Sequence, residues 1–112
     1  MVRVKICGVT NESDLRAVDT AGADAVGVIA DVPVDTPREV SLDEARDLVG
    51  AAPPFLTTTL VTMPDTVADA VDAAVRVEPD VLQLHGDFGP EELDAIRTDV
   101  AADLVAVVDA AD

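Results

Sequence analysis

Residues 23–30 read ADAVGVIA, and this short run decides the fold class. It is largely apolar and shows no alternation of polar residues, which is typical of a strand buried on both faces of a parallel sheet. A helix is predicted just before it, because Thr10 or Asn11 can cap a helix that runs to about Ala21 and stops at Gly22. The run therefore begins a strand that follows a helix.

The same alternation of strand and helix continues outward along the chain. The predicted strands are residues 2–7, 23–30, 55–62, 80–86 and 103–110. Further helices are predicted from Ser41, whose spacing to Glu44 is that of a capping box, from Pro64 and from Pro90. Four strand–helix units and a fifth strand predict a parallel sheet with right-handed crossovers.

Two architectures fit this alternation. A doubly wound sheet would be complete in 112 residues, whereas a (β/α)8 barrel needs roughly 250 and would be cut in half. Since no linker, repeat or low-complexity segment divides the sequence, residues 1–112 are expected to form a single domain.

The charge balance excludes some partners. With 23 acidic and 7 basic residues the net charge is −16, which repels nucleic acid and anionic membranes. Because 49% of the residues are hydrophobic, the chain is expected to fold, and its acidity indicates adaptation to high salt. At about 1 M salt the screening length is only about 3 Å, so the self-repulsion largely vanishes. Lysine is nearly absent from the chain, and the single one, Lys5, lies in a predicted strand, which makes it a candidate for a functional role.

Other classes of protein and site are also not expected. The sequence has no apolar run long enough to span a membrane and no leader with a basic and then an apolar segment. One cysteine cannot form an internal disulfide, so a cytoplasmic location is expected. No group of residues has metal-ligand spacing, and neither a phosphate loop nor a dinucleotide fingerprint is present.

Candidate functional residues lie at the ends of two predicted strands. In residues 2–7 the even positions are apolar and should pack under helices, whereas Lys5 and Cys7 should point to the opposite face. In the fourth strand Gln83 and His85 should project to that same face. Polar residues at the carboxyl ends of parallel strands are where α/β folds bind and transform ligands.

Each candidate also has a plain structural interpretation. Cys7 can be a small buried hydrophobe and His85 a hydrogen-bonded histidine of the core or surface. Arg38 can be a surface charge, and Asp109, at the end of the fifth strand, is one of many aspartates. The pattern alone leaves these alternatives open.

Four segments resemble one known family in their order and spacing. The segments are KICGVTNESD (5–14), AGADAVGVI (21–29), PREVSLDEA (37–45) and VLQLHG (81–86). The resemblance runs from residue 2 to about residue 87, and the family is phosphoribosylanthranilate isomerase. The resemblance implies a (β/α)8 barrel and an isomerase of tryptophan biosynthesis that uses no cofactor or metal. Its reaction is an Amadori rearrangement of an aminoaldose phosphate to an aminoketose phosphate.

The resemblance also implies roles for individual residues. Cys7 would be the general base that takes the proton from the sugar carbon next to the imine carbon. Arg38 would hold the anthranilate carboxylate, and Gln83 and His85 would line the substrate pocket. A free thiol has a reference pKa near about 8.5, so a base role needs a stabilised thiolate. Lys5, one pleat away on the same face, is inferred to supply positive charge.

Two parts of the family's site have no counterpart in the sequence. The family's general acid is an aspartate after the sixth barrel strand, and its phosphate site follows strands seven and eight. Asp109 lies one strand early and is not expected to be the acid. We therefore expect the N-terminal half of a barrel, inactive alone, that self-associates or pairs with the missing half. The alternatives are a non-catalytic half-barrel that serves in assembly and a small flavodoxin-like domain that binds another ligand.

Overall fold

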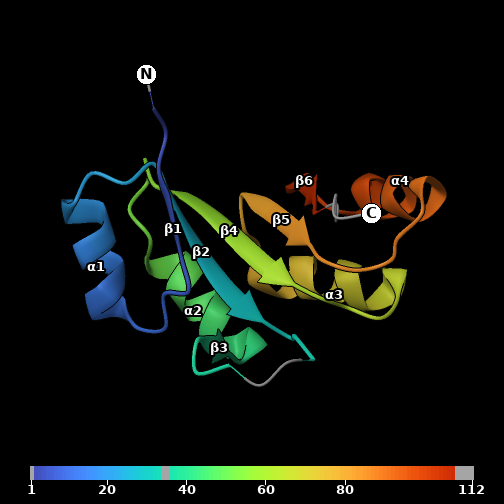
Figure 1. Cartoon of the computed structure of the whole chain (residues 1–112), viewed down its shortest axis with the longest axis horizontal. Helices are drawn as coiled ribbons and strands as arrows, with labels where there is room; N and C mark the ends of the chain where they lie inside the picture. The colour runs from blue at the N-terminus through green and yellow to red at the C-terminus, as the bar shows by residue number, and fades with distance from the viewer. Residues whose placement is uncertain (1, 34–35, 108–112) are drawn as a thin grey trace, which may run out of the picture.

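A computed structural model describes residues 2–33 and 36–107 of the chain and shows one parallel sheet with four helices (Figure 1). None of the helices in these ranges is long and apolar enough to cross a membrane. The elements are β1 (Lys5–Cys7), α1 (Glu12–Thr20), β2 (Ala25–Ala30), β3 (Glu39–Val40), α2 (Leu42–Ala51), β4 (Thr57–Thr62), α3 (Val67–Val77), β5 (Val81–Leu84), α4 (Pro90–Asp99) and β6 (Asp103–Ala106).

The order of the strands in the sheet follows their order in the chain. The path is β1-β2-β4-β5-β6, every described pairing is parallel, and the two-residue β3 pairs with β2 beside this path. A doubly wound sheet reverses its strand order at a switch point, and this path has no such point. Each helix packs against the next one, so the four lie along one face of the sheet (Figure 1). The flavodoxin-like alternative is therefore wrong.

The core lies between the sheet and the helices. Its main cluster packs Leu60, Leu82 and Leu84 of the central strands against α2, α3 and α4, with Ile96 of α4 fully buried. A smaller cluster under α1 packs Leu15 and other apolar side chains against the start of β2. In β5 the buried Leu82 and Leu84 alternate with the partly exposed Val81 and Gln83, which confirms the expected division of that strand. The face opposite the helices is called the inner face below.

Local capping fixes where helices begin. Asn11 Oδ1 accepts a hydrogen bond from Asp14 N at 2.8 Å, and Ser41 and Glu44 form the predicted capping box. The predicted start of the third helix at Pro64 is wrong, because Thr66 caps a helix that begins at Val67.

The apolar spacing after Pro64 predicts a buried face with Val67, Ala70, Val71, Ala74 and Val75, and this prediction is partly wrong. Val75 is 59% exposed, whereas the buried positions are the alanines 70, 73 and 74 together with Val77. These small residues let α3 lie close to the sheet and to its neighbours α2 and α4, so the true contact face is centred on alanines instead of on the larger valines.

The first predicted strand differs most from the structure. Only Lys5–Cys7 forms a strand, and Val2, Val4 and Ile6, expected under the helices, are 84%, 46% and 42% exposed. The reason is that β1 is an edge strand, paired with β2 on one side. β4 begins at Thr57, two residues later than predicted, and leaves Phe55 98% exposed.

The fifth predicted strand is shorter than expected within the described chain. It forms β6 over Asp103–Ala106, and the predicted positions 108–110, which include Asp109, lie outside the described residues. The expectation that Asp109 is not the general acid therefore stays a prediction.

Candidate functional site at the carboxyl edge

Cys7 is the last residue of β1 and pairs with Gly27 of β2. It is an exposed free cysteine, so the structure contradicts its interpretation as a small buried hydrophobe. The register places Cys7, Gly27 and Thr59 side by side across three strands. Because strand residues in register share a face, the thiol lies on the same face as Thr59.

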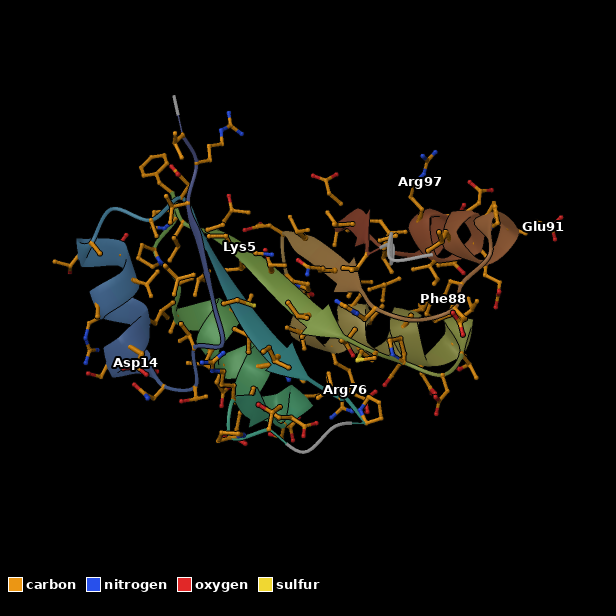
Figure 2. The ribbon with its side chains drawn as sticks, in the orientation of Figure 1. Lys5, Asp14, Arg76, Phe88, Glu91 and Arg97 are labelled. Carbon is orange, nitrogen blue, oxygen red and sulfur yellow. The ribbon has the colours of Figure 1, made fainter. Side chains whose placement is uncertain are left out.

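Lys5 crosses the inner face to reach β5. Its Nζ donates a hydrogen bond to Gln83 Oε1 at 2.5 Å, although β2 and β4 separate the two strands. Figure 2 shows the Lys5 side chain extending from β1 over the sheet. A sheet must curl for two such side chains to meet across two intervening strands, because adjacent strands are about 4.8 Å apart. The contact therefore unites two of the predicted site residues and reports the curvature of the sheet. The inferred effect of Lys5 on the Cys7 thiol stays a prediction.

Arg38 lies against the turn that follows Cys7. A Cβ at Gly8 would come within 2.8 Å of Arg38 Cδ, so the arginine stem rests directly on the Gly8 backbone. Gly8 has φ +92°, which also favours glycine there. β3 positions the arginine, because Glu39, the next residue, pairs with Ile29 of β2. The sequence does not predict this short strand.

His85 directly follows β5, and its backbone N–H donates to Thr62 O at 3.1 Å. Its side chain lines a cleft of about 320 Å³ at the carboxyl ends of β2, β4 and β5. The ring is exposed, so the structure contradicts a core position. The other lining residues are Pro33, Met63, Pro64, Asp65, Gly86, Asp87 and Phe88.

Met63 and Phe88 are two cleft residues that the sequence analysis missed. Phe88 packs over Gly86, where a Cβ would lie 3.5 Å from its ring, and Figure 2 shows its side chain near the start of α4. Both residues follow a strand by a few positions, and this placement after β4 and β5 was the available signal. They give the cleft an apolar side next to His85.

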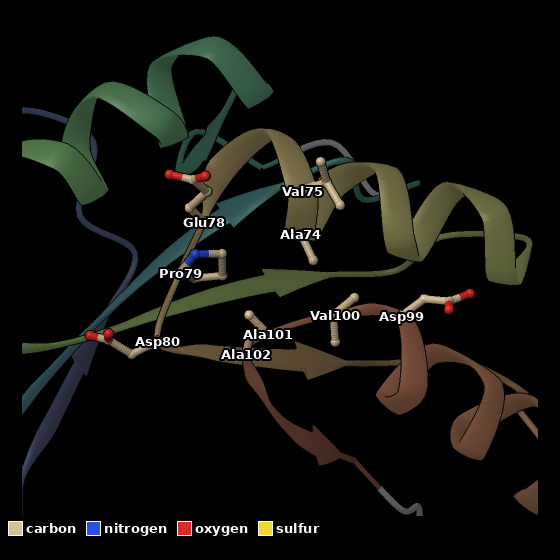
Figure 3. Close-up of a pocket in the computed structure, with 9 residues that line it drawn as sticks. All are labelled: Ala74, Val75, Glu78, Pro79, Asp80, Asp99, Val100, Ala101 and Ala102. Atoms are coloured by element: carbon tan, nitrogen blue, oxygen red, sulfur yellow. The ribbon is translucent and has the colours of Figure 1, made fainter.

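A larger pocket lies at the opposite, amino-terminal edge of the sheet. It measures about 490 Å³ and lies between the end of α3 and the turn from α4 to β6 (Figure 3). Ala74, Val75 and Val100 supply apolar lining, and Glu78, Asp80 and Asp99 supply acidic groups. It contains none of the predicted site residues. In parallel barrels this edge serves stability and the carboxyl edge serves catalysis, so size does not identify the functional site here.

The described residues contain no group of three or more His, Cys, Asp or Glu side chains arranged to hold a metal ion. The site is thus built from a thiol, a guanidinium, an imidazole and a Lys–Gln pair. Cys7 ends β1, Arg38 follows β2 and His85 follows β5 at one edge of the sheet, while Lys5 and Gln83 lie within β1 and β5 on the inner face. A singly wound parallel sheet with helices on one face and reactive side chains at its carboxyl edge defines part of a βα barrel with its ligand site at the strand ends.

Comparison with known proteins identifies which barrel this is. The family model described as N-(5'-phosphoribosyl)anthranilate (PRA) isomerase matches residues 4–110, so the chain belongs to that family. It is 65% identical over 112 residues to the N-(5'-phosphoribosyl)anthranilate isomerase of the halophilic archaeon Haloferax volcanii, covering 100% of this chain and 50% of that protein.

Solved structures give the same result. The crystal structure of the Thermotoga maritima enzyme superposes with a TM-score of 0.81 at 33% identity and covers 95% of this chain and 50% of that one. A crystal structure of a phosphoribosyl anthranilate isomerase in complex with reduced 1-(o-carboxyphenylamino)-1-deoxyribulose 5-phosphate gives 0.82 at 33% identity, over 95% and 53%. The chain thus spans about half the length of these relatives and has the fold of half a (β/α)8 barrel, as expected.

Proposed function

We propose that this chain supplies one catalytic half of a phosphoribosylanthranilate isomerase of tryptophan biosynthesis. The observation that carries the proposal is the contact of the Arg38 stem with Gly8, the residue directly after Cys7. Cys7 and Arg38 are 31 positions apart in sequence. Family membership gives the reaction in which a thiol base and a carboxylate-binding cation would be used together.

In this proposal Cys7 is the general base. Its thiolate removes the proton from the sugar carbon next to the imine carbon, the C–H electron pair forms a C=C bond, and the C=N pair moves onto the protonated imine nitrogen to give an enaminol. The enaminol becomes the aminoketose when the former imine carbon gains a proton and the hydroxyl on the neighbouring carbon loses one. Arg38 holds the anthranilate carboxylate through paired N–H donors. Gln83 and His85 face the substrate from β5, and Met63 and Phe88 supply apolar surface in the adjoining cleft.

A second catalytic group is needed, because the ring oxygen must receive a proton as the sugar opens. We propose that this acid and the phosphate anchor come from the part of the family's length that the chain does not match, about half of it. Remote phosphate contacts position the reacting sugar, so the chain alone should bind substrate poorly as well as lack an acid.

The sheet edges support pairing with such a second half. β1 and β6 are the two ends of the strand path, and Val4, Ile6 and Val105 beside them are 46%, 42% and 45% exposed. Unpaired edges with exposed apolar residues favour association. The proposed site of action is the cytoplasm, where an exposed unpaired thiol remains reduced.

The decisive experiment measures isomerase activity in three preparations. They are the chain alone, the chain mixed with the unmatched half of the Haloferax volcanii relative, and the two halves fused as one polypeptide. We expect no turnover by the chain alone and turnover by the fusion. Turnover by the monomeric chain alone would overturn the division of catalytic groups, and an inactive but folded fusion would favour the non-catalytic assembly module.

A further inference from the structure

Gly27 lies beside the Cys7 thiol in a way that no other residue can reproduce. A Cβ placed on Gly27 would be 2.6 Å from Cys7 Sγ and 3.3 Å from both Cys7 Cα and Cβ. Contacts under about 3.0 Å are far inside the optimum separation of roughly 3.5–4.0 Å between non-bonded atoms, so even alanine would force the sulfur to move. The thiol therefore occupies the space that a side chain would fill.

The backbone does not demand glycine at this position. The described glycines in the left-handed region are Gly8, Gly22 and Gly86, and Gly27 is not among them. Gly27 pairs regularly with Cys7 on one side and with Thr59 on the other. An ordinary strand residue would fit its backbone conformation, so the restriction at this position comes from Cys7, most strongly from its sulfur and less from its Cα and Cβ at 3.3 Å.

The carbonyl of Gly27 also fixes the turn after Cys7. It accepts hydrogen bonds from Gly8 N at 2.9 Å and from Val9 N at 3.2 Å. Gly8 in turn supports the stem of Arg38. One residue of β2 thus contacts the cysteine through its bare Cα and holds the turn on which Arg38 rests.

We propose that Gly27 is a positioning residue for the Cys7 thiol. Its missing side chain lets the sulfur lie across β2 on the inner face, and its carbonyl holds the following turn. The catalytic part of this inference rests on the proposed function, in which Cys7 is the base. A displacement of about 1 Å at a reacting group can reduce turnover by about 10²-fold, so displacement of the sulfur matters more than the small volume of a methyl group.

The first test needs no catalysis and uses Gly27→Ala with Gly50→Ala as the matched control. Gly50 lies in α2 with nothing within 4 Å of its would-be Cβ. Cys7 is the single cysteine, so the rate of reaction with Ellman's reagent reports this thiol alone. We expect Gly27→Ala to change the rate constant at least about threefold, and Gly50→Ala to leave it unchanged, since thiol reactivity follows its surroundings.

A second measurement separates positioning of the thiol from a general need for glycine. If the sulfur causes the conflict, Gly27→Ala should lower the melting temperature in the parent and much less in the Cys7→Ala background. A purely structural role would give the same loss in both backgrounds. Such equal losses, or a Gly27→Ala thiol rate equal to that of Gly50→Ala, would overturn the proposal.

The third measurement uses the fused two-half enzyme. We expect Gly27→Ala to lower kcat by about 10–100-fold with little change in KM, and to add no loss to Cys7→Ala. A Gly27→Ala fusion with the parent kcat would overturn the catalytic part of the inference. Full turnover in Cys7→Ala would instead overturn the proposed function, while the thiol rates would still decide the role of Gly27.

Discussion

The two edges of the sheet use polar side chains in opposite ways. At the amino edge, Asp80 Oδ2 accepts hydrogen bonds from Thr58 N and Oγ1 at 2.9 and 3.1 Å, and Asp80 N donates to Thr58 Oγ1 at 3.0 Å. Asp24 similarly accepts from Val4 N at 2.7 Å. Each carboxylate immediately precedes a strand and binds backbone in the neighbouring strand or directly before it. These hydrogen bonds therefore link neighbouring strands at the amino edge of the sheet.

At the carboxyl edge only some of the polar side chains bind the protein itself. Thr62 Oγ1 donates to Asp31 O at 3.2 Å, whereas the exposed side chains of Cys7, Arg38 and His85 make no hydrogen bond to the described residues. The sheet thus uses Asp24 and Asp80 to link strands at the amino edge, and it presents three candidate site side chains at the carboxyl edge. Mutations at the amino edge should therefore lower mainly the stability of the fold, and mutations at the carboxyl edge should lower mainly the turnover.

The largest expected effect is that of Cys7→Ala on turnover. In the fused two-half enzyme we expect kcat to fall by about 10²–10⁴-fold, the usual contribution of general base catalysis. The melting temperature should change little because Cys7 is exposed. Steady-state kinetics and a thermal melt of the same preparation check both. A variant within about threefold of the parent kcat would return Cys7 to a structural role.

Asp80→Ala should show the reverse pattern. It leaves the backbone N–H of Thr58, a residue 4% exposed, without its acceptor, which should lower the free energy of unfolding by about 1–3 kcal/mol. Urea denaturation of the chain measures this loss, with the exposed Asp47→Ala on α2 as control. Equal losses in the two variants would mean that the amino edge is not held by this carboxylate.

Salt should affect the whole molecule more than the Asp80 contact. Because the net charge is −16, the melting temperature should rise from about 0.1 M to about 1 M salt, as the screening length falls from about 10 to about 3 Å. The difference between the parent and Asp80→Ala should stay nearly constant, because a direct hydrogen bond is screened far less. A melting temperature independent of salt would contradict the predicted salt adaptation.

The smallest expected effect is that of Lys5→Met, which removes the contact with Gln83 across the inner face. Both side chains are partly accessible to water, so the loss should be about 1 kcal/mol or less. Denaturation curves compare it with Lys5→Arg, which keeps a donor. If the methionine variant unfolds at the same urea concentration as the parent, the Lys5–Gln83 hydrogen bond does not stabilise the folded chain.

Local chemistry explains which parts of the fold could be predicted. The caps at Asn11 and Ser41 depend on residues three positions apart, and the structure confirms both. The burial of β2 follows from its own composition. The edge position of β1 could not be predicted, because the exposure of Val4 and Ile6 depends on what pairs with the strand and not on the strand itself.

The candidate site also has residues that the local sequence predicts and residues that depend on the complete fold. The end of each strand could be found from its sequence, so Cys7, Gln83 and His85 were predicted to lie at one edge. The contact of Arg38 with Gly8 depends on β3, a two-residue strand with no periodicity to detect. Met63 and Phe88 lie in irregular segments, where only the resulting fold places them beside His85. Long-range geometry thus accounts for most of what was missed.

The chain-order arrangement of the strands has a consequence for folding during synthesis. From β2 onward, each strand pairs with one that left the ribosome before it, and each helix packs against its predecessor. Contacts of this kind close short segments of chain, which favours rapid formation of native structure. The sheet can therefore grow one unit at a time from its N-terminal end, and no strand after the first needs a later segment to find its initial partner.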